Sequence, residues 1–242
     1  MGIQMDLVTT TLAKAGANAS GDLLKKESES FLKVVLGEPA KSLGGLFSDQ
    51  INARRHANLI KITVAAKRRL DDGGISANEV PLKIIHPLLE GACLEESPDL
   101  QDMWAALLAG AATKGEDAFY AGFIHVLKQI SPEEARFLKA LRKRINNNIG
   151  IFEALPEEEK KTAPRPDMRR IGLAADLYIL FCDANGITEC DEDACIFASI
   201  CFENLARLGI IGTPSFGRAA YSMCPYGAVF LECCCDDVDK TS

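Results

Sequence analysis

Apolar residues recur at helical spacing along most of the chain. In residues 49–70, behind a capping Ser48 or Asp49, the apolar positions near the helical period are Ile51, Leu59, Ile62, Ala66 and Leu70. The same spacing predicts further helices over residues 80–95, 97–111, 118–129, 131–146 and 191–208. The clearest helix start is Ser131-Pro132-Glu133-Glu134, which joins an N-cap serine, a first-position proline and a capping-box glutamate. The pattern predicts a mainly α-helical protein.

The helix that carries the single tryptophan is expected to lie at the centre of the core. One of its faces is wholly apolar and consists of Leu100, Met103, Trp104, Leu107, Leu108 and Ala111. Helices with such a face bury it against neighbouring elements. We therefore expect Trp104, Leu107 and Leu108 to be mostly buried.

The last third of the chain changes character. Residues 153–168 hold three prolines and five consecutive charges, which predict a loop or a linker. Residues 169–182 are apolar and suit either a helix or a strand. Helix 191–208 is expected to turn Ile196, Ile200, Leu205 and Leu208 inward. Gly209 ends it, and short β-type runs at 210–211 and 221–230 predict a terminal hairpin.

This order of elements is typical of a winged-helix arrangement. Residues 132–146 would form its first helix, 191–208 the helix in the recognition position, and 210–231 the wing. We expect a mainly α fold in which an N-terminal helical region precedes a C-terminal winged-helix-like module with a short β-hairpin. The expected parts are a helical, flexible segment at 1–48, a helical core at 49–130, and the module at 131–242 with its linker near 153–168.

Composition and charge narrow the classes of function. Hydrophobic residues make up 48% and charged residues 25%, which excludes wholesale disorder. The net charge of −7 excludes binding to nucleic acid or anionic membrane by bulk charge. The longest uncharged stretch, 219–231, is shorter than the roughly 20 apolar residues of a spanning helix. We expect a cytoplasmic protein whose nine cysteines are reduced thiols.

Several runs of residues resemble the bacterial Abi-alpha family over residues 40–231. The most specific is Met103-Trp104-Ala105-Ala106-Leu107-Leu108-Ala109. The others are residues 43–46, the helix through Arg54, 81–90, 95–100, 123–135, 208–209, 221–227 and Phe230. The ending departs from the family, because Met223-Cys224-Pro225 stands where Leu-Thr usually precedes the glycine. The resemblance implies a role in abortive infection, a bacterial defence against phage, and brings no catalytic residues with it.

The charge of the C-terminal segment argues against DNA as the partner of the predicted module. From Asp183 onward the chain holds three basic and ten acidic residues. The helix in the recognition position carries Asp191, Glu192, Asp193 and Glu203 against Arg207 alone. Phosphate contacts need lysine and arginine on the surface that faces the groove. We therefore expect this helix to contact protein.

Basic residues gather on helix 131–146 and after it. They suit an anionic partner such as an acidic protein, a lipid headgroup or RNA, although such runs are commonly solvated surface. The candidate patch consists of Arg136, Lys139, Arg142, Lys143, Arg169 and Arg170.

A second candidate contact segment lies nearer the N-terminus. Glycines between large apolar residues suit a membrane surface or packing on the body or a second subunit. The segment consists of Leu43, Gly44, Gly45, Leu46 and Phe47.

No pattern for metal, cofactor or catalysis emerges. Zinc ligands usually come in pairs two to four residues apart, and no CxxC occurs among Cys190, Cys195, Cys201 and 233–235. His56, His86 and His125 are scattered, and no nucleophile or phosphate-loop motif is present. We predict no catalytic residue, no metal and no cofactor.

These observations together predict a non-enzymatic component of bacterial anti-phage defence, of the abortive-infection type, that acts through protein–protein contacts. Its partner would be a second defence protein or a phage component, or a second copy in a homo-oligomer. One alternative is a membrane- or lipid-associated effector, peripheral at a membrane. A second alternative is a winged-helix transcriptional regulator, although DNA is not expected as a partner.

Overall fold

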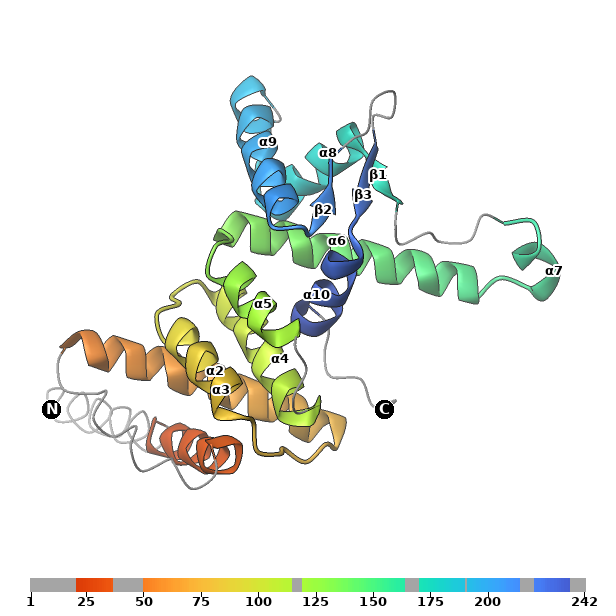
Figure 1. Ribbon diagram of the computed structural model, residues 1–242. Helices are drawn as coiled ribbons and strands as arrows, with labels where there is room; N and C mark the ends of the chain where they lie inside the picture. The colour runs from red at the N-terminus through yellow and green to blue at the C-terminus, as the bar shows by residue number, and fades with distance from the viewer. Residues whose placement is uncertain are drawn as a thin grey trace, which may run out of the picture.

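Helices make up most of the computed structural model, and three short strands lie in its C-terminal half (Figure 1). The structure describes residues 21–36, 50–114, 119–163, 170–189, 191–213 and 220–235. Residues 21–36 are helical. The labelled elements are α2 (Gln50–Gly73), α3 (Leu82–Ala92), α4 (Pro98–Lys114), α5 (Phe119–Leu127), α6 (Pro132–Glu153), α7 (Glu157–Lys160), β1 (Arg170–Leu173), α8 (Ala174–Ala184), α9 (Glu192–Arg207), β2 (Ile211–Gly212), β3 (Ala220–Met223) and α10 (Pro225–Cys235). The prediction of a mainly helical chain is confirmed.

Helix α4 lies at the centre of the core, between α2, α3, α5 and α10 (Figure 1). Trp104 is 1% exposed, and Leu107 and Leu108 are fully buried, which confirms the prediction for this helix. The helical residues 21–36 pack on α2, where Ser28 and Thr63 share a buried hydrogen bond of 2.7 Å between their hydroxyls. A small polar pair thus ties the first described helix to the core without leaving a hydroxyl unsatisfied.

The long helix α6 lies between the core helices on one side and the three strands with helices α8 and α9 on the other (Figure 1). Its predicted capping box is present: Ser131 Oγ accepts from the Glu134 N–H at 3.2 Å, and Glu134 Oε2 accepts from the Ser131 N–H at 2.7 Å. The helix runs to Glu153, beyond the predicted end near residue 146, because the half-buried Ile149 continues its apolar spacing. In the predicted linker, residues 157–160 form the single turn α7.

The strands form one antiparallel sheet in the order β1-β3-β2. The predicted hairpin is present as β2 and β3. Residues 169–182 suit either a helix or a strand by their sequence, and the structure places there the third strand, β1, followed by α8. The expectation of β-structure up to Phe230 is wrong, because β3 ends at Met223 and helix α10 begins at Pro225. Proline suits a first helical turn, and an apolar run of this length cannot by itself distinguish the two states.

Aromatic rings join the C-terminal elements to α6. The Phe202 ring of α9 lies 5.0 Å from Phe137 of α6, 5.2 Å from Tyr178 of α8 and 5.4 Å from Tyr221 of β3, measured between centroids. Phe181 of α8 lies 5.8 Å from the same ring. Tilted and edge-on ring pairs of this kind stabilise beyond their buried area. Phe202 therefore sets the inward face of α9.

Helix α10 returns from the sheet to the core, and a glycine permits its approach. The Phe230 ring lies 5.5 Å from Phe123 of α5 and the Tyr226 ring 5.2 Å. A Cβ added at Gly227 would stand 2.0 Å from the carbonyl oxygen of Ile210. No side chain fits there, since that oxygen belongs to the backbone that leads into β2.

We predict that Gly227→Ala destabilises the protein by at least about 2 kcal/mol, because overpacking against fixed backbone costs energy of this order. The matched control is Gly150→Ala in α6, where an added Cβ meets nothing within 4 Å. That change should be neutral or stabilising by up to about 1 kcal/mol. Urea unfolding followed by circular dichroism measures both, and equal stability of the two variants would contradict the close contact.

Candidate functional site

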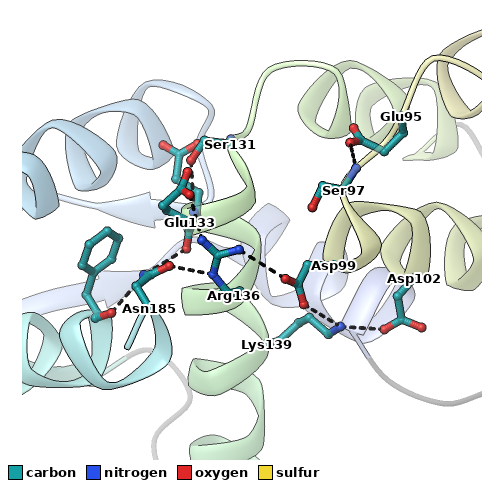
Figure 2. A network of polar contacts seen from close by, with 11 residues as sticks. Glu95, Ser97, Asp99, Asp102, Ser131, Glu133, Arg136, Lys139 and Asn185 are labelled. Atoms are coloured by element: carbon teal, nitrogen blue, oxygen red, sulfur yellow. Dashed lines mark hydrogen bonds and ion pairs between the residues drawn. The ribbon is translucent and has the colours of Figure 1, made fainter. Parts of the chain in front are cut away.

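Two residues of the candidate basic patch, Arg136 and Lys139, form ion pairs within the chain (Figure 2). Arg136 Nη2 lies 2.8 Å from Glu133 Oε1 and its Nη1 lies 3.4 Å from Asp99 Oδ2 of α4. Lys139 Nζ lies 2.7 Å from Asp102 Oδ2 and 3.5 Å from Asp99 Oδ1. Two basic residues of α6 are thus paired with two acidic residues of α4.

The network extends to two further helices. Arg69 of α2 pairs with Asp102. Arg136 Nε donates to Asn185 Oδ1, just beyond α8, at 2.8 Å (Figure 2). Burial opposes ionisation of Asp102, but the Lys139 hydrogen bond and the charges of Arg69 and Lys139 outweigh it and lower the pKa of this carboxyl. Single partly exposed pairs contribute little. Together these contacts link α2, α4 and α6 to one another and to the end of α8.

The remaining residues of the predicted patch are dispersed. Arg142 is buried and Lys143 is exposed. Arg170 begins β1, and Arg169 lies outside the described residues, as does the candidate segment Leu43, Gly44, Gly45, Leu46 and Phe47. An anionic partner stays a prediction, and the internal ion pairs of Arg136 and Lys139 do not favour it. The signal that could have found these pairs is the matching i, i+3 spacing of Asp99 and Asp102 on α4 with Arg136 and Lys139 on α6.

Cys201 and Cys234 are two of the buried cysteines in the described part of the chain. Burial raises the pKa of Cys201 to about 12, helped by the charges of Glu134 and Glu133. Burial also raises the pKa of Cys234, and more weakly so do the neighbouring thiols. Thiolates, not thiols, bind metals and attack substrates. Among the described residues, no group of three or more metal-binding side chains comes together.

Helix α9 exposes apolar side chains that the sequence placed inside. Ile196 is 53% exposed, Ile200 58% and Phe197 41%. The expectation that Ile196 and Ile200 turn inward is wrong, whereas Leu205 is buried and Leu208 half-buried as expected. The reason is competition between faces: Ala198, Cys201, Phe202 and Leu205 pack inward, which turns Ile196 and Ile200 outward. We call Ile196, Phe197 and Ile200 the α9 apolar face.

The polar residues of α9 give this region negative charge. The Asp191 side chain caps the helix by accepting from the Ala194 N–H at 2.9 Å, and Glu192 and Asp193 are exposed beside it. Arg207, the one basic residue of α9, donates to Gln129 Oε1 at 3.0 Å and to Asn204 Oδ1 at 2.7 Å. Its guanidinium therefore helps to join α9 to the end of α5, and the start of the helix carries only acidic charge.

We predict that Asp102→Asn destabilises the protein at pH 7 by about 1 kcal/mol, because both Arg69 and Lys139 lose a charged partner. A carboxyl with a lowered pKa contributes stability that is complete above its ordinary value of 3.8 and is lost as the pH falls through the lower value of the folded state. The variant should therefore lose less stability than the wild type as acid is added. Thermal unfolding between pH 7 and pH 2 measures this, with Asp72→Asn at an exposed position of α2 as control; parallel curves for wild type and Asp102→Asn would contradict it.

Comparison with known proteins places this architecture in a family. A family model described as abortive infection alpha matches residues 54–223. The match begins in α2 and ends in β3, so it includes the ion pairs between α4 and α6 and the α9 apolar face. Searches of curated proteins and of solved structures find no match. The resemblance expected from the sequence is confirmed: the chain belongs to the abortive infection alpha family.

Proposed function

We propose that this protein is a non-enzymatic component of bacterial anti-phage defence and acts by binding another protein. Family membership supports the role in abortive infection. The observation that carries the protein contact is the α9 apolar face, where three large apolar side chains lie exposed within five consecutive positions of one helix. Grouped exposure of this kind marks interaction surfaces.

The module that presents this face is, in our proposal, a winged-helix-like unit. Apart from the single turn α7 between α6 and β1, the order α6, β1, α8, α9, β2 and β3, with β3 as the central strand, supports this assignment. In such a unit α9 occupies the position that reads DNA in regulators. Here that position presents isoleucine and phenylalanine with acidic residues, which suits a protein surface.

A transcriptional regulator is less well supported. Each phosphate contact needs a lysine or an arginine. Arg207 is engaged with Gln129 and Asn204, and the exposed Glu192 and Asp193 would repel the DNA backbone. As for a membrane-associated effector, no helix of the described part of the chain has both the length and the apolar character needed to cross a bilayer.

We predict that Ile196→Ser combined with Ile200→Ser abolishes protection against phage while the protein stays folded. Both side chains are more than half exposed, so their loss removes binding surface and little packing. The efficiency of plating of a diverse phage panel on bacteria that express each variant measures protection. The matched control is Ile151→Ser on α6, an isoleucine 66% exposed outside this face. Failure of the wild type to restrict any phage would contradict the defence role, and full protection by the double variant would contradict the role of α9.

The non-enzymatic part of the proposal has its own test in the same plating assay. His86 and His125 are the exposed histidines of the described chain, and they lie on different helices, α3 and α5. We predict that His86→Ala and His125→Ala, taken singly, keep full protection, because neither acts as a general base. Complete loss of protection in either variant with an unchanged melting curve would indicate catalysis.

A further inference from the structure

Acidic residues stand at both ends of the α9 apolar face. Positions three and four apart share one face of a helix. Asp193 lies three positions before Ile196, and Glu203 lies three positions after Ile200. All four side chains are exposed. The outward stripe of α9 therefore reads carboxylate, isoleucine, isoleucine, carboxylate.

The stripe rests on a firm base. The Phe197 ring packs edge-on against Phe181 of α8, with centroids 5.8 Å apart and an interplanar angle of 69°. Behind the stripe, Tyr178 and Ser199 join α8 to α9 through a hydrogen bond of 2.6 Å between their hydroxyls. A surface held in this way loses little conformational entropy when it binds.

We propose that the α9 apolar face binds an amphipathic helix of a partner protein whose apolar stripe is flanked by lysine or arginine. This inference rests on the proposed function and adds the chemistry of the partner. The isoleucines supply apolar contact, and the carboxylates at each end select basic flanks by charge complementarity. The length of the stripe suits about three turns of such a helix.

The charges argue against the two other occupants. A second copy of α9, in either orientation, would bring the Asp193 and Glu203 carboxylates of one protomer against those of the other. Anionic lipid would likewise be repelled by both residues. A basic helix turns the same two charges into attraction.

The probe is a 14-residue synthetic helix of leucine and lysine, compared with a second peptide in which glutamate replaces every lysine. Fluorescence anisotropy with the full-length protein measures both affinities. We expect the lysine peptide to bind at least about tenfold more tightly than the glutamate peptide. Added salt should weaken binding of the lysine peptide, because salt screens the attraction between surface charges.

Two double variants locate the binding. Ile196→Ser with Ile200→Ser should lower the affinity for the lysine peptide at least about tenfold. Asp193→Asn with Glu203→Gln should weaken it and reduce its salt dependence. Asp191 is left intact because it caps α9. The controls are Ile151→Ser for the apolar change, and Glu158→Gln with Glu159→Gln in the distant α7 for the charge change (Figure 1). Circular dichroism melting verifies that each variant folds.

Each remaining outcome decides against the inference. Equal affinity for the two peptides, or no binding of either, overturns the partner chemistry. It is also overturned if Ile151→Ser weakens binding of the lysine peptide as much as Ile196→Ser with Ile200→Ser does. A dimer in sedimentation velocity that disappears in the isoleucine double variant overturns it in favour of a second copy. The plating assay keeps the two proposals distinct. If the isoleucine double variant loses protection but the wild type binds neither peptide, the proposed function stands and the partner chemistry is wrong. If the isoleucine double variant keeps full protection, the role of α9 in the proposed function is wrong.

Discussion

Glu134, a buried carboxylate in the first turn of α6, joins the two halves of the structure. Its Oε2 accepts from the Ser131 N–H at 2.7 Å, and the amide of Asn204 on α9 donates to its two oxygens at 2.9 and 3.1 Å. Burial raises the pKa of this carboxyl, although the hydrogen bonds from Ser131 and Asn204 oppose the rise. The Glu134 side chain therefore caps the start of α6 and also fixes the position of α9 through Asn204. A buried acid is tolerable only where its oxygens are satisfied in this way.

The outward surface of α9 is a consequence of that attachment. Asn204 holds the helix at its C-terminal end, and Phe202 turns one side of it into the aromatic cluster with Phe137. A helix fixed at one end and on one side has no freedom left to bury Ile196 and Ile200. Their exposure follows from the packing of α9 and does not depend on any feature of these two residues themselves.

The basic residues of α6 and the apolar residues of α9 lie in surroundings that differ from those expected from the sequence. Two residues of the basic run of α6, Arg136 and Lys139, pair with Asp99 and Asp102 across the contact between α4 and α6. The apolar run of α9, which has the spacing of a core helix, supplies exposed surface in addition to core. In our proposal the apolar stripe of α9 with its acidic ends is the recognition surface, and Arg136 and Lys139 join α6 to α4.

The sequence by itself determined the helices between residues 49 and 146 and helix 191–208, the capping box at Ser131 and Glu134, the burial of Trp104 and the family, because these depend on local spacing and on nearby residues. Tertiary structure alone decided which face of α9 turns inward, since Ile196 and Phe202 belong to the same apolar run and only the rings of α6 and α8 distinguish them. It also decided that the residues after Pro225 form a helix, where Gly227 passes the Ile210 carbonyl on the way to the core. The orientation of α9 and the helical state of residues 225–235 depend on contacts between residues far apart in the chain, and a local sequence pattern does not predict such contacts.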